Sequence, residues 1–212
     1  MLHKSRFRSL TLVLVVNFIL NHLLREAPST ANLLGALLYT VIAFALIWAY
    51  GGERRRMFFL LLLNLILVVF RWSFLFIDSD FVHLAILVSA SVFFIALIQS
   101  LFKSLISSHE VDADTLYGSV AIYFLLGNLW NSFYVLIRFF DPEAFVTSYG
   151  DMNLLYYSFV TLVGLGYGDI VPVSSLARLT ASLEGITGTL YVAIVISRVV
   201  GLYISERRPS GE

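Results

Sequence analysis

The chain has 212 residues, of which 59% are hydrophobic and only 13% are charged, and its formal net charge is zero. A soluble domain carries about 25% charged residues, so the composition indicates a membrane protein, and the balanced charge gives no sign of a nucleic-acid partner. Cysteine is absent, which excludes disulfides and thiolate metal sites.

A membrane-spanning helix needs about 20 mostly apolar residues. The candidate spans, in chain order, are residues 9–24, 32–50, 57–77, 82–102, 116–139 and 177–203. The first is the weakest, because Asn17, Asn21 and His22 interrupt it. A basic start and small residues after it are also typical of a cleaved signal peptide, which is the alternative for this segment.

Lysine and arginine clusters predict the orientation, because they favour the cytoplasmic side of a membrane. In a six-span arrangement one side holds the basic residues at 4–8, 54–56, 103 and 207–208. The other side is acidic and holds Glu26, Asp78, Asp80, Asp141, Glu143 and Asp169, with the single exceptions Arg25, Arg138 and Arg178. We therefore expect a multi-pass protein of the cell membrane with both termini in the cytoplasm.

Arg71 lies inside the third span, near its outer end. A charge within a membrane span is a candidate functional group. The alternative is that its long side chain reaches outward to the membrane surface and pairs with Asp78 or Asp80.

The segment between the fifth and sixth spans contains the most informative motif. Asp151 is suited to be the N-cap of a short helix that ends near Val163, and such a helix is too short to cross the membrane. It is followed by residues 166–169, Gly-Tyr-Gly-Asp, whose glycines allow the backbone to turn its carbonyl oxygens toward a dehydrated ion. Non-helical backbone at membrane depth must be buried or line water, so we expect several chains around one axis.

Residues 116–204 resemble the potassium channel pore family. The resemblance rests on residues 158–161 (Ser-Phe-Val-Thr), 166–172 (Gly-Tyr-Gly-Asp-Ile-Val-Pro) and 182–188 (Ser-Leu-Glu-Gly-Ile-Thr-Gly). It implies an all-α membrane protein with six transmembrane helices and a re-entrant pore helix and selectivity filter between helices five and six. Because the chain has one such filter and the family is tetrameric, the resemblance also implies a homotetramer.

The resemblance assigns roles to individual residues. Potassium ions would be held, with no other metal or cofactor, by the backbone of Gly164, Leu165, Gly166, Tyr167 and Gly168, the last at the outer mouth. Filter support would come from Thr161, Tyr156, Tyr157, Asp169 and Glu184. Gly188 matches the glycine hinge of the inner helix.

One position departs from the family pattern. Gly164 stands where the family usually has a threonine, whose hydroxyl completes the innermost ion site. Glycine keeps the carbonyl, removes the hydroxyl and allows more backbone conformations. We expect a weaker or more hydrated innermost site, with potassium preference retained by the outer carbonyls.

Two further charges lie in the sixth span. Glu184 is expected either to support the filter from behind or to pair with a neighbouring charge such as Arg178, because a buried carboxylate needs a partner. Arg198 either faces the pore as a barrier to cations or faces lipid headgroups and the linker acids.

The chain divides into residues 1–102, a four-helix domain in the position of a voltage sensor; 103–115, a cytoplasmic linker; 116–204, the pore domain; and 205–212, a short cytoplasmic tail. A voltage sensor needs repeated charges in one span, each worth about 2.3 kcal/mol per 100 mV. The fourth span has no lysine or arginine, so voltage gating is not expected. The sequence favours no particular alternative stimulus for opening.

The sequence therefore predicts a tetrameric channel that conducts potassium passively. The alternatives are a weakly selective cation channel, because of Gly164, a potassium transporter and a non-conducting subunit. A single pore loop with both filter glycines argues against the transporter, and the intact motif argues against the non-conducting subunit. No nucleophile–base pair or phosphate-binding loop indicates an enzyme.

Overall fold

The computed structural model describes residues 6–23, 37, 40, 41, 44, 54–74, 76, 77, 79–107, 113–148, 150 and 152–201. Its elements are α1 (Arg6–Leu23), α3 (Arg54–Ser73), α4 (Asp80–Ser107), α5 (Ala113–Phe140), β1 (Phe145–Thr147), α6 (Leu154–Val163), β2 (Ile170–Pro172), α7 (Ser175–Leu190) and the π-helical continuation η2 (Tyr191–Ile196).

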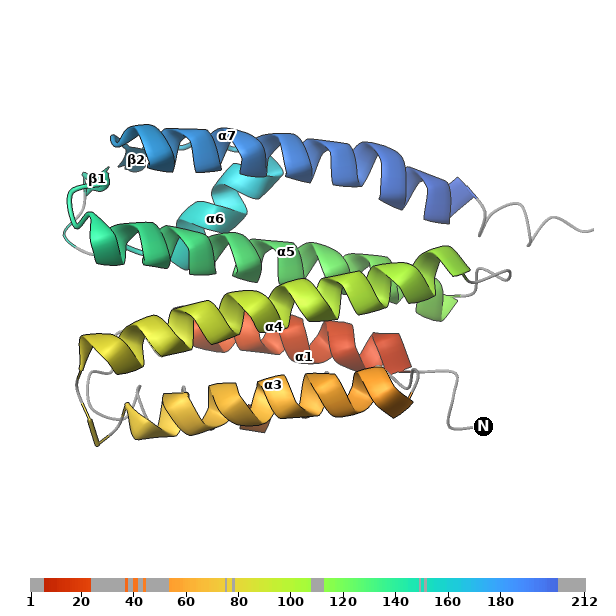
Figure 1. The fold of residues 1–212 in the computed structure, drawn as a ribbon. Helices are drawn as coiled ribbons and strands as arrows, with labels where there is room; N and C mark the ends of the chain where they lie inside the picture. The colour runs from red at the N-terminus through yellow and green to blue at the C-terminus, as the bar shows by residue number, and fades with distance from the viewer. Residues whose placement is uncertain are drawn as a thin grey trace, which may run out of the picture.

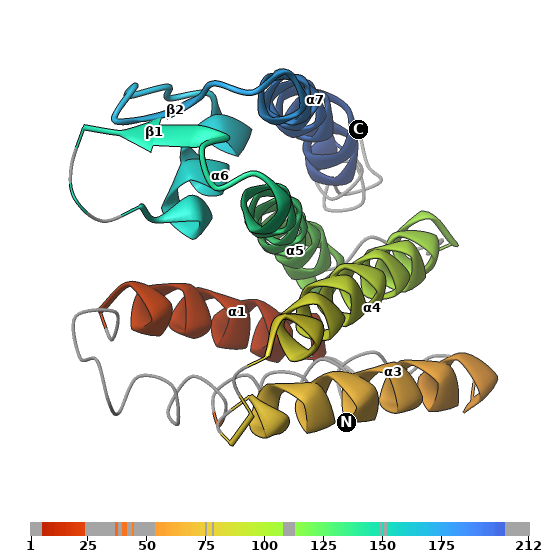
Figure 2. The same ribbon diagram turned by 60° about the vertical axis from the view of Figure 1, so that its left-hand side comes forward.

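The long helices lie side by side and run along one common direction, whereas α6 is short and lies inclined between α5 and α7 (Figures 1 and 2). Helices α1, α3 and α5 begin at one end of this bundle, and α4 and α7 begin at the other end (Figure 1). The strands β1 and β2 lie at the end where α4 and α7 begin (Figure 1). We call this end the filter end, because the filter-like segment, residues 164–168, leads from α6 to β2 there.

Three helical segments of the described chain are long and apolar enough to cross a membrane, namely Asp80–Lys103, Ala113–Phe140 and Ser175–Gly201. They correspond to the predicted fourth, fifth and sixth spans. The apolar parts of α1 and α3 are shorter, at Phe7–Leu20 and Met57–Ser73. The predicted second span, 32–50, lies almost wholly outside the described residues, so the number of six spans stays a prediction.

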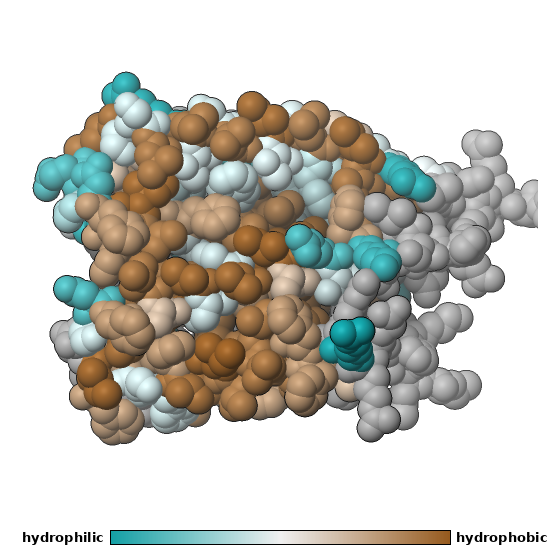
Figure 3. Space-filling view, viewed as in Figure 1, coloured by the Kyte–Doolittle hydropathy of each residue, from teal (hydrophilic) through white to brown (hydrophobic). Residues whose placement is uncertain are grey.

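The surface has the polarity expected of a protein in a bilayer. Apolar side chains cover much of the visible face along the helices, and hydrophilic side chains gather toward the two ends of the bundle (Figure 3). The exposed apolar side chains of the described helices include Phe58, Leu65, Phe81 and Val92. Such an area would be unfavourable in water, so the fold agrees with a location in the membrane.

Helix α1 packs along α5 and reaches the pore-loop helix. Thr11 donates a hydrogen bond to the Tyr117 carbonyl at 2.7 Å, and Leu10 and Leu14 are buried in the core shared by α1, α4 and α5. At the other end of α1, the Phe18 ring lies 4.5 Å from the Phe159 ring of α6. The weakest predicted span is therefore an integral part of the packing around α6.

A carboxylate of α5 caps the N-terminus of α1. Asp114 accepts hydrogen bonds from the backbone amides of Phe7 and Arg8, at 3.2 and 3.1 Å. These amides belong to the first turn of α1, whose N–H groups have no partner within the helix. The cap thus joins two helices that are more than 100 residues apart in the sequence.

Asp114→Ala is expected to destabilise the protein by about 1 kcal/mol, because loss of an N-cap side chain costs about that much. The expected fall in melting temperature is roughly 2–4 °C, measured by thermal unfolding of the purified protein in detergent. Glu143→Ala removes an exposed carboxylate and is the control. Equal melting temperatures for the two variants would contradict the capping role.

The structure adds two features to the sequence-based prediction, whose division of the chain into domains stays a prediction. Helix α4 continues to Ser107 and α5 begins at Ala113, so both helices extend into the predicted linker of 103–115. In addition, β1 and β2 form a two-stranded antiparallel sheet in which Thr147 pairs with Ile170. The all-α prediction missed these short strands, because three-residue strands leave no hydrophobic periodicity in a sequence.

Candidate functional site

Helix α6 is the short pore-loop helix that the sequence predicts. It has 10 residues, which corresponds to about 15 Å and only half of the hydrocarbon thickness of a bilayer. Its N-cap is Asn153, whose side chain accepts a hydrogen bond from the Tyr156 amide at 3.0 Å. The expectation that Asp151 would be the N-cap was therefore wrong: asparagine fills this role as well as aspartate, and Asp151 itself lies outside the described residues.

Gly164 ends α6. It has a φ of 81° and a ψ of 24°, in the left-handed region. Its amide lies 3.1 Å from the Thr161 carbonyl, and the Leu165 amide lies 2.9 Å from the Val160 carbonyl. These are the two hydrogen bonds of a Schellman motif, which uses a glycine in this conformation to stop a helix. Glycine at this position thus has a structural reason independent of any ion.

The backbone after α6 has an alternating conformation. Gly164, Gly166 and Gly168 have positive φ values of 81°, 60° and 75°, and no described non-glycine residue has a positive φ. Residues of opposite handedness therefore alternate along the segment. This alternation turns successive peptide planes so that their carbonyl oxygens can face one side, whereas in an ordinary strand they alternate.

The filter-like segment, residues 164–168, is exposed in the isolated chain. Residues 163–168 are all exposed, and the side chains of Leu165 and Tyr167 have exposed fractions of 56% and 65%. Each added Cβ atom at Gly164, Gly166 or Gly168 would meet no atom within 4 Å. The positive φ values therefore explain why glycine occupies these positions, whereas close packing among the described residues does not.

The two strands hold the backbone that follows the filter. Ile170, the first residue of β2, pairs with Thr147 of β1. The Ser148 amide donates to the Asp169 carbonyl at 3.0 Å, which adds a further link directly after Gly168. The backbone of Asp169, one of the predicted supporting residues, is therefore anchored to the loop between α5 and α6.

Glu184 lies at the centre of a buried polar cluster. Its side chain is completely buried in α7 and accepts a short hydrogen bond from the Tyr134 hydroxyl of α5. The Ser158 hydroxyl oxygen of α6 lies 2.6 Å from Glu184 Oε1 and 2.8 Å from the Gly127 carbonyl oxygen. This cluster joins the outer helix, the pore-loop helix and the inner helix, and such fully bonded buried networks make a packing arrangement specific.

Gly188 lies against the end of α6. A Cβ atom added there would lie 2.0 Å from the Leu162 carbonyl oxygen and 2.9 Å from its carbon. The same carbonyl oxygen accepts a hydrogen bond from the Tyr123 hydroxyl at 3.1 Å. Close contact between two backbones therefore explains glycine at this position, and the hinge role stays a prediction.

The inner helix changes its winding three residues after Gly188. The segment η2 is a π-helical turn, and its Tyr191 hydroxyl donates to the Ser119 carbonyl of α5 at 2.7 Å. Further along, Arg198 is exposed in the isolated chain. The π turn had no signal in the sequence, because it differs from an α-helix only in backbone hydrogen bonds that span one residue more.

The predicted aromatic residues of α6 differ in their surroundings. The Tyr157 ring is buried and lies edge-on against Tyr134 and Phe145, with centroid distances of 5.0 and 5.6 Å. Its hydroxyl interacts with that of Thr161, one helical turn later. Tyr156 is partly buried beside the same cluster. Tyr157 and Thr161 therefore pack within the subunit together with the Glu184 cluster.

Sequence reasoning did not single out Tyr134 and Tyr123 of α5. Both hydroxyls bond to groups more than 35 residues away, and nothing in the local sequence marks such a pairing. Ser158 belongs to residues 158–161, on which the family resemblance partly rests, but the resemblance assigned it no role. The need of Glu184 for a buried partner was the one available signal, and it pointed to no particular residue.

Comparison with known proteins gives an independent result for this half of the chain. Residues 114–205 match the family model described as "Ion channel". A segment of 89 residues is 35% identical to "Two-pore potassium channel 1" of Arabidopsis thaliana, which covers 42% of this chain and 23% of that protein. The match thus spans less than a quarter of the length of this relative, and no solved structure matches.

The matched segment coincides with the elements that build the site, from α5 through the filter segment to the inner helix. The matches are to ion channels and not to enzymes. Residues 114–205 of this membrane protein are therefore similar to ion channels, and a segment of 89 residues is similar to a potassium channel.

Proposed function

We propose that the chain forms a homotetrameric channel that conducts potassium passively through the carbonyls of residues 164–168. The observation that carries this proposal is the exposed filter segment with left-handed glycines at every second position. Such a backbone is unfavourable at membrane depth unless it lines a water-filled axis shared by several copies. Rings of carbonyl oxygens around that axis would replace the hydration shell of a potassium ion.

The inner helix supports assembly around such an axis. Leu179, Leu183, Ile186 and Leu190 of α7 are exposed in the isolated chain, with exposed fractions between 47% and 57%. Within the proposed tetramer these side chains would pack against neighbouring subunits or line the inner part of the pore. Thr161, Tyr157, Asp169 and Glu184 would then hold the filter from behind.

The proposed orientation places the filter end of the bundle outside the cell. The exposed basic residues Arg8, Arg55 and Lys103 belong to the opposite end of α1, α3 and α4, which is the side that the positive-inside rule assigns to the cytoplasm. Both termini would then be cytoplasmic. α4 contains no lysine or arginine before Lys103, so the proposed gating does not depend on voltage.

The test is a reversal potential. The purified protein is placed in a planar bilayer with potassium on one side and sodium on the other. We expect a reversal potential near the potassium equilibrium value. A robust current that reverses near zero would replace the proposal with a weakly selective cation channel, and the absence of any current at all applied stimuli would favour a non-conducting subunit.

The weakly selective channel is the second candidate, because Gly164 provides no hydroxyl to the innermost ion site. Gly164→Thr restores the hydroxyl but strains a backbone with a φ of 81°, at a cost of about 1–3 kcal/mol. Gly164→Val has the same branched shape and the same strain without the hydroxyl, so it is the matched control.

We expect Gly164→Thr to increase the preference for potassium over sodium relative to Gly164→Val, measured as a shift in reversal potential. Both variants should be less stable than the native protein. If the threonine and valine variants have the same selectivity and conductance as the native protein, the innermost site is not weakened by glycine.

A further inference from the structure

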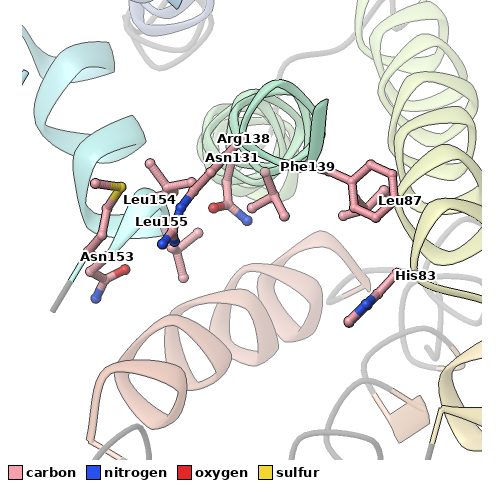
Figure 4. A pocket seen from close by; sticks show the side chains of 10 residues that line it. His83, Leu87, Asn131, Arg138, Phe139, Asn153, Leu154 and Leu155 are labelled. Atoms are coloured by element: carbon pink, nitrogen blue, oxygen red, sulfur yellow. The ribbon is translucent and has the colours of Figure 1, made fainter. Parts of the chain in front are cut away.

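A groove at the filter end of the bundle lies outside the conduction machinery. It has a volume of about 500 Å³ and lies between α4, α5 and the N-terminus of α6 (Figure 4). Its lining residues are His83, Leu87, Asn131, Val135, Arg138, Phe139, Met152, Asn153, Leu154 and Leu155. The volume is in the range of sites that hold organic ligands.

The polar groups of the groove are mainly hydrogen-bond donors. Arg138 offers a guanidinium group, and the Asn131 carboxamide makes no hydrogen bond to another described residue. Asn153 uses its side-chain oxygen for the α6 cap, which leaves its NH₂ group for another acceptor. Arg138 and Asn131 lie on the same side of α5, about two helical turns apart, and Figure 4 shows both side chains at the groove.

No carboxylate among the described residues compensates the positive charge of the groove. Among the described residues no carboxylate lies within ion-pair distance of Arg138, which is exposed. The described carboxylates of this end, Asp80, Asp141, Glu143 and Asp169, are not among the lining residues. A cation beside several NH donors fits a phosphate group, whose oxygens only accept hydrogen bonds at neutral pH.

The position of the groove relative to the membrane indicates the source of that phosphate. Arg138 lies in the last turn of α5, which is long enough to span a bilayer, so the guanidinium lies at headgroup depth. The apolar wall continues from there along Leu87, Val135 and Leu155, toward the acyl-chain region. A free phosphate ion would leave this apolar wall exposed, whereas an acyl chain would bury it.

We propose that this groove binds an anionic phospholipid, with the phosphodiester at Arg138 and Asn153 and one acyl chain along Leu87, Val135 and Leu155. An anionic lipid is favoured over a zwitterionic one because it brings no cation next to Arg138. The bound lipid would link α4 of the first half of the chain to the N-terminus of α6. This inference does not depend on ion conduction and is tested without a current.

The test is lipid binding by the full-length protein in detergent, measured by native mass spectrometry with phosphatidylglycerol and phosphatidylcholine. We expect tighter binding of phosphatidylglycerol, and a loss of roughly tenfold in its affinity in Arg138→Gln, as for one charge-assisted hydrogen bond. Arg55→Gln removes an exposed arginine at the opposite end of the bundle and should bind like the native protein. Equal affinity in the two variants would overturn the proposal.

A second pair of variants tests the apolar wall. Leu87→Trp fills the groove and should weaken phosphatidylglycerol binding, whereas Val92→Trp places the same side chain on the exposed surface of α4 outside the groove and should not. If Leu87→Trp has no effect and inorganic phosphate displaces phosphatidylglycerol, the site holds a free anion and the lipid proposal is wrong.

Discussion

Gly188→Ala is expected to destabilise the protein by at least about 3 kcal/mol, the upper part of the range for overpacking a core. The new Cβ atom would lie 2.0 Å from the Leu162 carbonyl oxygen, and this neighbour is backbone that cannot rotate away. Helix α7 would have to move away from the end of α6, which directly precedes the proposed filter. The measurement is thermal unfolding in detergent, combined with potassium flux into vesicles.

Gly185→Ala is the matched control, because it lies on the same helix. The nearest atom to its added Cβ is the Thr161 carbonyl oxygen at 3.9 Å, an ordinary contact distance. Alanine favours helix over glycine by roughly 0.5–1 kcal/mol, so this variant should be as stable as the native protein or slightly more stable.

The two measurements separate packing from bending at Gly188. If the residue acts as a hinge, Gly188→Ala would keep the native melting temperature and lose flux. If packing is its main role, both fall together, and a native melting temperature would contradict our expectation.

Glu184→Ala is expected to cost about 3–5 kcal/mol. The change leaves a cavity among α5, α6 and α7 and removes the acceptor of the Tyr134 hydroxyl, which would stay buried without a partner. Because Ser158 of α6 belongs to the same cluster, the orientation of the pore-loop helix should also change. The measurement is the melting temperature together with the reversal potential between potassium and sodium.

Tyr134→Phe tests the same cluster more gently, because it removes one hydroxyl and keeps the ring packing. Combining it with Glu184→Ala in a double-mutant cycle should give a coupling energy of about 0.5–3 kcal/mol. Glu143→Ala is the control, since Glu143 is exposed. Additive effects of Tyr134→Phe and Glu184→Ala would mean that the hydrogen bond contributes no stability.

The helices that the structure describes follow closely from the sequence. The predicted spans 82–102 and 116–139 lie within α4 and α5, and 177–203 overlaps α7 and its π-helical continuation. Long apolar runs determine these elements, because a chain in a bilayer must satisfy its backbone hydrogen bonds within each helix. The motif at 166–169 likewise predicted the irregular backbone after a short helix, since only glycine adopts positive φ without strain.

The contacts between these elements were not predictable in the same way. The pairing of Glu184 with Tyr134 and Ser158, the contact of Gly188 with the Leu162 carbonyl, and the cap of α1 by Asp114 each join distant segments. Sequence patterns report local conformation and burial, whereas such contacts depend on how the helices are placed against one another.

The sequence alone therefore determined that the chain lies in a membrane and has an irregular, glycine-dependent backbone after a short helix, because composition and backbone-specific glycines are local properties. Only the tertiary structure decided what surrounds this glycine-dependent segment: a buried carboxylate shared by three helices, a backbone contact that requires Gly188, and a two-stranded sheet directly after Asp169. The physical reason is that these interactions arise from packing geometry, and side chains far apart in the chain meet only after the helices have assembled.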